Sequence, residues 1–280
     1  MKKVGVCEWC LPVWGPDSIG FAADIGFEGV QLTDLGGATK GFPMTNPMIR
    51  EAYMEASART GVALHSMHLH SLPRLGGMIF PLDSPKGEAT KLALRNGIDS
   101  CEAMGIKILN ISVFLQSAIK NDYDFDNFIA SIRYAAAYGE DHDVLVVYEP
   151  SVTLEQTLRI LELVPEIRIN HDLLNRSKRG PEVEIPALIN VIDHVHIKDA
   201  RRDLFGFISG PCLAGDGTGL VRESVQLLNE LGYDNWYLSE SDYLKPKAYG
   251  LGTEDITEIC RRDLARIREL INGGGGQKDE

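Results

Sequence analysis

The segment LVVYEPSVTLEQTLRILELVPEIRINHD, residues 145–172, contains one full repeat of the pattern that decides the fold. An apolar run ends at Glu149, helical apolar spacing covers residues 154–164, and a second apolar run ends at Asp172. A strand, a helix and a strand in this order predict a βαβ unit with parallel strands. Because the carboxyl ends of parallel strands meet at one edge of a sheet, Glu149 and Asp172 are expected on the same side.

The same alternation extends along the chain. Apolar runs predict strands over residues 4–10, 29–33, 63–70, 108–113, 145–149, 167–172, 194–199 and 237–240. The intervening segments predict helices over residues 17–26, 46–61, 90–105, 126–139, 154–164, 182–192, 221–232 and 254–271. Gly26, Gly61, Gly105 and Gly232 close four of these helices and suit left-handed C-caps.

Repeated βα units over 280 residues predict an α/β fold, a closed (β/α)₈ TIM barrel in a single domain. An open dinucleotide-binding sheet is disfavoured, because no G-x-G-x-x-G follows the first strand. We expect the barrel over residues 1–272, with Thr253 capping the last helix, and a disordered tail over residues 273–280. The long loops over residues 34–47 and 71–87 follow strand ends and are expected to cover the mouth of the barrel as lids.

The composition excludes several classes of protein. With 28 Lys and Arg against 40 Asp and Glu, the net charge of −12 disfavours nucleic acid as a partner. No apolar stretch is long enough to span a membrane and no signal-peptide core follows Met1, so we expect a cytoplasmic protein without a membrane partner. The five cysteines are interpreted as reduced thiols, since Cys7 and Cys10, three apart on the predicted strand, would point to opposite faces.

Four of the predicted strands end in ionisable side chains, namely Glu149, Asp172, His196 and Glu240. Three carboxylates that converge beside apolar strands need a cation between them. A site rich in oxygen ligands with one imidazole predicts one divalent metal ion. Mn²⁺ is favoured, with Mg²⁺, Co²⁺ and Zn²⁺ as alternatives.

The strand over residues 194–199 offers two histidines on one face. His196 is preferred as the ligand over His194, because it lies nearer the carboxyl end of the strand. Asp199 has two interpretations: it orients the imidazole of His196, or it caps the following loop, and we favour the cap.

The sequence resembles the xylose isomerase-like barrel superfamily of sugar isomerases and epimerases. The resemblance extends over roughly residues 4–271. It is carried by GFEGVQL at residues 26–32, EP at 149–150, DLLN at 172–175, HVHIKD at 194–199 and LSE at 238–240. It implies that Glu149, Asp172, His196 and Glu240 bind one metal ion, and that Glu149 and Glu240 are also the catalytic acid and base. It further implies a small carbohydrate substrate and a homo-oligomer.

The resemblance also leaves alternatives open. Asn175 replaces the histidine that ketose epimerases of this group carry, and no second glutamate follows Glu149 at their usual distance. The leading hypothesis is an isomerase or epimerase of a sugar or keto-polyol that abstracts a proton next to a carbonyl. A lyase or dehydratase acting on a keto-inositol or an oxidised glycoside is the alternative, and a non-catalytic sugar-binding barrel is a hypothesis of another class. A related endonuclease would need more metal ions and a basic groove.

Further residues are candidates for substrate binding because of their chemistry and their place near strand ends. Arg202, like Arg201, can grip oxygens, and the ring of Trp14 or Trp9 can stack on a sugar, although a core role is favoured for Trp9. The proposed substrate-binding residues are His68, His70, Asn110, Asn175, Arg202 and Trp14. The glycine-rich residues 215–219 resemble a phosphate loop but follow no strand directly, so a flexible turn is favoured.

Overall fold

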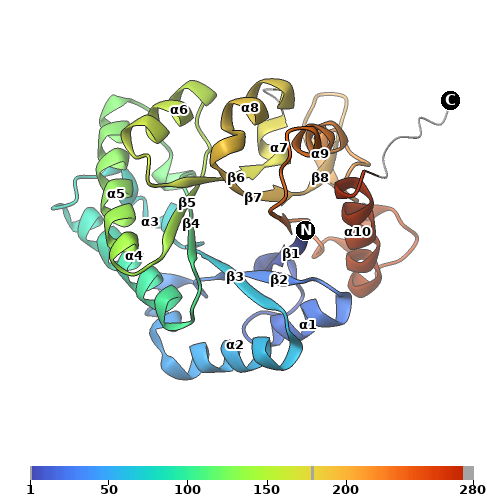
Figure 1. The fold of residues 1–280 in the computed structure, drawn as a ribbon, viewed down its shortest axis with the longest axis horizontal. Coiled ribbons are helices and arrows are strands. Elements are labelled where there is room, and N and C mark those ends of the chain that lie inside the picture. Colours follow the sequence, from blue (N-terminus) through green and yellow to red (C-terminus); the bar gives the residue numbers. More distant parts are fainter. Residues whose placement is uncertain (1, 178–179, 274–280) are drawn as a thin grey trace. The chain divides into compact units, whose positions relative to one another are not determined.

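The eight predicted strands are present and form a closed parallel barrel in the order β1-β10-β7-β6-β5-β4-β3-β2 (Figure 1). The structure is a computed structural model that describes residues 2–177 and 180–273. The barrel strands are β1 Lys3–Cys7, β2 Gly29–Thr33, β3 Ala63–His68, β4 Ile108–Ser112, β5 Leu145–Glu149, β6 Arg168–Asp172, β7 Ile192–Ile197 and β10 Trp236–Ser239. The prediction of a (β/α)₈ barrel is therefore confirmed.

Helices follow the strands as the apolar spacing predicts. The longer helices are α1 Asp17–Ile25, α2 Pro47–Thr60, α4 Pro85–Ala103, α5 Asp122–Asp141, α6 Leu154–Leu163, α8 Pro181–Leu188, α9 Val221–Glu230 and α10 Ile256–Ile271. Two helical turns, α3 Leu72–Leu75 and α7 Leu173–Arg176, lie in the loops after β3 and β6. The four predicted C-cap glycines all have positive φ, a backbone conformation that an L-residue adopts only at a cost.

Some predicted boundaries are wrong for local reasons. The first strand ends at Cys7, because Glu8–Cys10 turns into a short 3₁₀ helix, so Cys7 and Cys10 do not share a strand. Helix α4, predicted over residues 90–105, already starts at Pro85, because the side chain of Ser84 caps it by accepting from the Gly87 amide. The last helix is capped by Asp255 rather than Thr253, since the Asp255 carboxylate accepts from the Thr257 amide.

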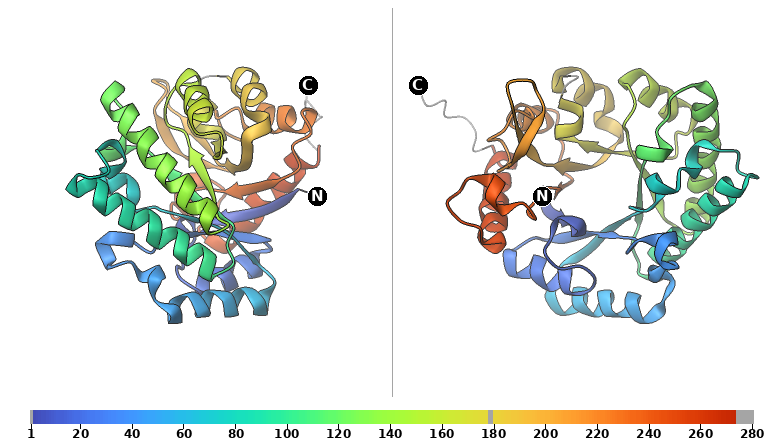
Figure 2. Two further views of the ribbon diagram at one scale, coloured as in Figure 1. Left: turned by 60° about the vertical axis from the view of Figure 1, so that its left-hand side comes forward. Right: turned by 180° about the vertical axis from the view of Figure 1, so that it is seen from behind.

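The chain groups into two compact units. The first comprises Met1–Val30, Thr60–Ala63 and His171–Glu280. In it β10 pairs with β1 on one side and with β7 on the other, with Leu238 opposite Gly5 and His196. This unit also contains an antiparallel hairpin that sequence patterns did not predict, formed by β8 Asp199–Arg202 and β9 Ile208–Cys212 and coloured orange in Figure 2.

The second unit comprises Gln31–Arg59 and Leu64–Asn170. In it β4 pairs with β3 and β5, with Asn110 opposite His68 and Ser112 opposite Glu149. Helices α4 and α5 pack against each other on the outside of these strands (Figures 1 and 2).

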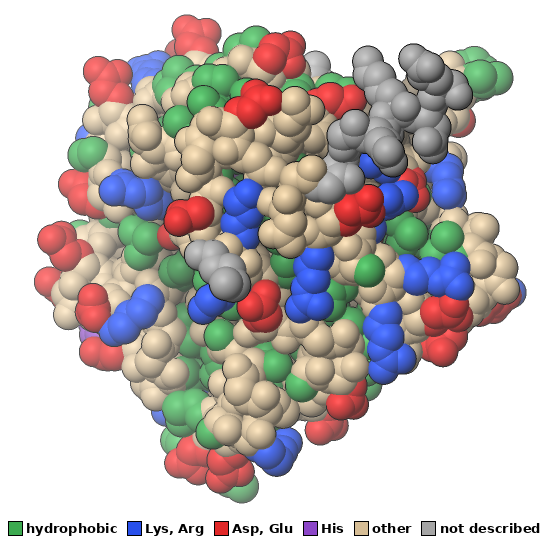
Figure 3. Space-filling view, turned by 45° about the vertical axis from the view of Figure 1, so that its right-hand side comes forward, with side chains coloured by type: hydrophobic (Ala, Val, Ile, Leu, Met, Phe, Trp, Pro, Cys, Tyr) green, Lys and Arg blue, Asp and Glu red, His purple; other side chains and the backbone are tan. Residues whose placement is uncertain are grey.

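Over the described residues, no helix combines the length and the apolar character that a membrane span requires. All five cysteines are free thiols in the interior, as the sequence predicts. Acidic and basic side chains are interspersed over the face drawn in Figure 3. The predicted tail falls, apart from Gly273, outside the described residues.

A buried ion pair joins the turn α7, which follows the candidate ligand Asp172, to helix α8. The guanidinium of Arg176 donates to both carboxylate oxygens of Glu184, with 2.8 Å between Nη2 and Oε1. Arg176 is 3% exposed and Glu184 is 1% exposed, so neither charge can be solvated by water instead. Removal of one partner from such a buried ion pair strongly destabilises the folded protein.

We therefore predict that Glu184→Ala lowers the free energy of unfolding by about 3–5 kcal/mol, because Arg176 would remain buried without this carboxylate. Urea denaturation measures the change. The control is Glu182→Ala on the exposed face of the same helix, expected to change stability by less than about 0.5 kcal/mol. Equal stability of the two variants would contradict the role of the ion pair.

Candidate metal centre

Three candidate ligands come together at the carboxyl ends of their strands. Asp172 ends β6, His196 lies near the end of β7, and Glu240 directly follows β10. Each offers a ligand atom, and these atoms lie within 4.8 Å of one another. Pairing of β10 with β7 fixes part of this geometry, and the Glu240 amide extends the ladder by donating to the Ile197 carbonyl at 3.0 Å.

Asp172 is held by the turn that it begins. Its Oδ1 accepts from the Asn175 amide and its Oδ2 from the Asn175 side-chain nitrogen, both at 2.8 Å. This is N-cap geometry, which fixes the carboxylate while leaving lone pairs on both oxygens. Asn175, predicted to bind substrate, thus contacts the candidate ligand directly and also lines the adjacent cleft.

The imidazole of His196 lies between Glu240 and Cys7. Its Nδ1 is 3.3 Å from Glu240 Oε2, and its Nε2 is 3.7 Å from Cys7 Sγ. In the tautomer with a proton on Nε2, that N–H donates to the sulfur and the Nδ1 lone pair points at Glu240. In that tautomer the Nδ1 lone pair and the Glu240 carboxylate can share a cation, whereas a proton on Nδ1 would be donated to Glu240.

Lys198 supplies a positive charge within this group. Its Nζ is 2.7 Å from Asp172 Oδ2 and 2.5 Å from Glu240 Oε2, so the ammonium bridges the two carboxylates. The other oxygen of Glu240, Oε1, accepts from the indole Nε1 of Trp9 at 3.1 Å. Glu240 is therefore oriented through both of its oxygens.

Burial and charge act on the two carboxylates in opposite directions. Burial raises the pKa of Asp172, although Lys198 counteracts it. Burial also tends to raise the pKa of Glu240, but the ammonium of Lys198 and, to a smaller extent, the neighbouring imidazole of His196 outweigh it and hold the pKa well below its ordinary value. Glu240 is thus an ionised group, and the site as a whole attracts cations.

The donor set fits a divalent metal ion. Two carboxylates and an imidazole nitrogen converge from three strands, and carboxylate oxygen with imidazole nitrogen suits Mn²⁺, Mg²⁺ or Co²⁺. Asp172, His196 and Glu240 would hold the ion. The partners of Asp172 and His196, namely Asn175 and Cys7, would orient these ligands.

Glu149, the fourth predicted ligand, belongs to the other compact unit. It ends β5, is half-buried, and follows the fully buried Tyr148. In the barrel order β5 neighbours β6, whose last residue is Asp172. Each of the two residues therefore ends its own strand.

A cleft of about 600 Å³ opens beside these ligands in the first unit. Trp9, Asn175, Lys198 and Glu240 line the part near the ligands. The β9 strand of the hairpin and the segment following Glu240 line the rest. The cleft can hold a molecule of sugar size next to the carboxylates.

The remaining predicted substrate residues have different surroundings. In the second unit, both ring nitrogens of His68 form hydrogen bonds, Nε2 with Ser112 Oγ at 3.0 Å and Nδ1 with the side-chain nitrogen of Asn110 at 3.2 Å. The ring centroids of His68 and His70 are 5.7 Å apart. Trp14 is 55% exposed. Arg202 donates to the Gly206 carbonyl within its own hairpin at 3.1 Å, and Arg201 donates to the carbonyls of Ala248 and Tyr249.

The glycine-rich residues 215–219 wrap around the carboxylate of Asp199. The amides of Gly215, Gly217 and Gly219 donate to it at 2.9–3.0 Å, as does the Ala200 amide. These N–H groups would otherwise suit an anion such as phosphate. The contacts agree with the favoured interpretation of Asp199 as a cap and of residues 215–219 as a turn.

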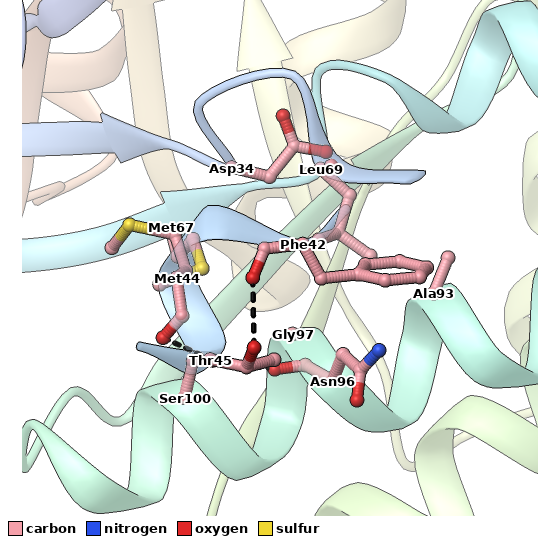
Figure 4. A pocket seen from close by; sticks show the side chains of 11 residues that line it. Asp34, Phe42, Met44, Thr45, Met67, Leu69, Ala93, Asn96, Gly97 and Ser100 are labelled. Carbon is pink, nitrogen blue, oxygen red and sulfur yellow. Dashed lines mark hydrogen bonds between the residues drawn. The ribbon is translucent and has the colours of Figure 1, made fainter. Parts of the chain in front are cut away.

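The loop over residues 34–47 is fastened within the second unit. Ser100 of helix α4 donates to the Met44 carbonyl at 3.0 Å, and Thr45 donates to the Phe42 carbonyl at 2.8 Å (Figure 4). The cavity between loop and helix measures about 10 Å³, which leaves space for at most one water molecule. This part of the loop packs closely against helix α4, and its role as a lid stays a prediction.

Sequence patterns missed several contributors to the site. Lys198 lies two residues beyond His196, directly after β7, and this spacing is the signal that could have identified it. Trp9, for which a core role was favoured, is only half-buried and donates to Glu240. Cys7 has no sequence signal, because its role depends on contact with a strand distant in sequence.

Comparison with known proteins agrees with this architecture. The family model of the xylose isomerase-like TIM barrel matches residues 19–269. The 2-epi-5-epi-valiolone 7-phosphate 2-epimerase of an Actinoplanes species is 27% identical, and the alignment covers 97% of this chain and 98% of the relative.

Two solved structures show the same fold. The D-psicose 3-epimerase of Clostridium cellulolyticum H10, solved with D-tagatose, has a TM-score of 0.75 at 13% identity over 96% of this chain and 99% of its own. A xylose isomerase-like TIM barrel protein of Mycobacterium smegmatis, solved in complex with magnesium, has a TM-score of 0.66 at 16% identity over 92% of this chain and 88% of its own.

We predict that Asn175→Ala weakens Mn²⁺ binding by about 10–100-fold, because Asp172 would lose the side-chain donor that orients it. Isothermal titration of metal-free protein measures the affinity. The matched control, Asn127→Ala, removes a half-buried side chain that donates to the Tyr123 carbonyl of its own helix, and should bind Mn²⁺ like the unaltered protein. Unchanged affinity in Asn175→Ala would show that Asp172 needs no such support.

Proposed function

Because the chain belongs to the xylose isomerase-like TIM-barrel family, we propose that it is a divalent-metal-dependent isomerase or epimerase of a sugar or keto-polyol. The observation that carries the proposal is the convergence of Asp172, His196 and Glu240 at one end of the barrel, next to a cleft of sugar size. Mn²⁺ is the proposed ion. Cytoplasmic localisation and a homo-oligomeric state are part of the proposal.

Glu149 is proposed as the fourth ligand, with Asp172, His196 and Glu240. Its place at the end of β5, beside β6 in the barrel order, supports this. When bound, the metal would polarise the substrate carbonyl and stabilise negative charge on its oxygen. Asn175 and Lys198 line the cleft beside Glu240 and would bind the hydroxyl groups of the substrate.

The proposed chemistry is proton transfer at the carbon next to a carbonyl. Glu240 lines the cleft and is oriented by Trp9, so its carboxylate is placed to accept a proton from a substrate bound there. Glu149 is proposed to deliver a proton to the same carbon or to its neighbour. Delivery to the opposite face of the same carbon gives an epimer, and delivery to the neighbouring carbon gives an isomer.

The name of the Actinoplanes relative supports epimerisation in particular, since its alignment with this chain covers nearly all of both proteins. Polar side chains in the lining of the cleft, Asn175, Lys198 and Asp242 among them, can form hydrogen bonds with the hydroxyl groups of a polyhydroxylated substrate.

Exchange of substrate hydrogen with solvent tests the reaction. We predict that the purified protein with Mn²⁺ incorporates one deuterium from D₂O into its keto-sugar or keto-polyol substrate at the carbon next to the carbonyl. Mass spectrometry and NMR of a panel of such compounds measure it, with chelator-treated protein as the control. An unsaturated or cleaved product would instead identify a lyase, and absence of exchange with every compound would argue for a binding protein.

The two glutamates are expected to be needed for turnover. We predict that Glu240→Gln and Glu149→Gln each lower the rate of exchange by about 10²–10⁴-fold, the contribution typical of a positioned acid or base. Glu230→Gln, on the surface of helix α9, is the matched control and should keep the full rate. If either site variant binds Mn²⁺ and retains full exchange, that glutamate is not the acid or base.

A further inference from the structure

We propose that Lys198 is a built-in counter-ion of the metal centre: its ammonium occupies the place between Asp172 and Glu240 when no metal is bound, and leaves when a divalent ion enters. The inference rests on the metal site of the proposed function but not on the reaction. It assigns to Lys198 control over metal affinity and over the stability of the metal-free protein.

The ammonium of Lys198 and a metal ion need the same oxygen atoms. Lys198 Nζ contacts Asp172 Oδ2 at 2.7 Å and Glu240 Oε2 at 2.5 Å. A metal ion would take these carboxylates at about 2.0–2.2 Å. Two cations that share two oxygens at such distances repel each other strongly. The lysine head and the metal therefore exclude each other from this position.

Without a metal ion, the carboxylates of the centre need another cation to balance their charge. Asp172 is 1% exposed, and a buried carboxylate without a counter-charge is costly. The Nδ1 atom of His196 also faces Glu240 Oε2. Lys198 neutralises this group of acceptors, so the strand ends can converge before a metal ion is bound.

The Lys198 side chain can move from the two carboxylates into the adjacent cleft. Its side chain is 19% exposed and lines the cleft of about 600 Å³. Its long, flexible stem has several rotatable bonds, so the head can turn into the cleft without a change in the backbone. A rigid arginine fork would not leave as easily.

An alternative role makes the opposite prediction. If Lys198 merely orients Glu240 and stays in place in the loaded enzyme, its removal would disorder a ligand and weaken metal binding. If it is displaced, its removal strengthens metal binding, because no ion pair must be broken first. The sign of the change separates the two roles.

The experiment measures Mn²⁺ binding to metal-free protein by isothermal titration, for the unaltered protein, for Lys198→Met and for Lys245→Met. Lys245 lines the same cleft but pairs with Asp242 at 2.7 Å. We expect Lys198→Met to bind Mn²⁺ at least about tenfold more tightly than the unaltered protein. This factor applies if Lys198 blocks the site in at least about nine tenths of the unaltered metal-free molecules. Lys245→Met should bind like the unaltered protein.

Thermal unfolding in the presence of a chelator gives a second readout. Lys198→Met should unfold at a lower temperature than the unaltered protein, and saturating Mn²⁺ should raise its melting temperature by a larger step. Equal or weaker Mn²⁺ affinity in Lys198→Met would overturn the proposal. Absence of Mn²⁺ binding in all three proteins would refute the metal site and the proposed function with it.

A measurement on the unaltered protein covers the case in which Lys198→Met does not fold. The Lys198 amine is expected to be acetylated faster by a small reagent after Mn²⁺ is added, because its head would then lie in the open cleft. Mass spectrometry of peptides reports the rate, with Lys245 as the internal reference. Equal or slower acetylation of Lys198 in the presence of bound Mn²⁺ would overturn the proposal.

Discussion

Neutralisation of the carboxylates at the ends of β6 and β10 is the interaction on which the rest of the site depends. Asp172 is buried at a strand end, and the pairing of β10 with β7 brings Glu240 next to His196. Without a positive charge between them, holding these carboxylates together out of water is costly. Lys198 provides that charge in the structure, and a divalent ion is proposed to provide it in the working enzyme.

The surroundings of these carboxylates are built to orient them. Asn175 fixes Asp172 through the start of a helical turn, and Trp9 fixes one oxygen of Glu240 from the turn after β1. Asp199 holds the glycine-rich turn that follows the hairpin, next to the lysine in sequence. Side chains that are held in this way lose little freedom on binding a ligand, which favours tight and specific coordination.

The sequence predicts what depends on local periodicity. All eight strands and the four ionisable strand ends follow from apolar runs and from the rule that parallel strands share one edge. It does not predict what depends on contacts between distant segments, such as the indole of Trp9 on Glu240 or the sulfur of Cys7 near His196. The hairpin β8–β9 was missed because its strands are short and carry glycine, proline and arginine instead of an apolar alternation.

Helix boundaries also depend partly on local sequence and partly on the geometry of the folded chain. Asp255 and Thr253 are both good capping residues, and only the backbone geometry decides that the Asp255 carboxylate accepts from the Thr257 amide. Lys198 is a similar case, because a lysine after a strand is usually solvated and its bridging role depends on the convergence of Asp172 and Glu240.

Anomalous diffraction from crystals saturated with Mn²⁺ tests the central claim most directly. Our proposal for the metal centre predicts one strong anomalous peak bonded by Asp172, His196 and Glu240 at about 2.0–2.3 Å. It also predicts that Glu149 is a ligand of the same ion, and that the ammonium of Lys198 is turned into the cleft. A peak elsewhere, or an ammonium that still bridges Asp172 and Glu240 in saturated crystals, would contradict it.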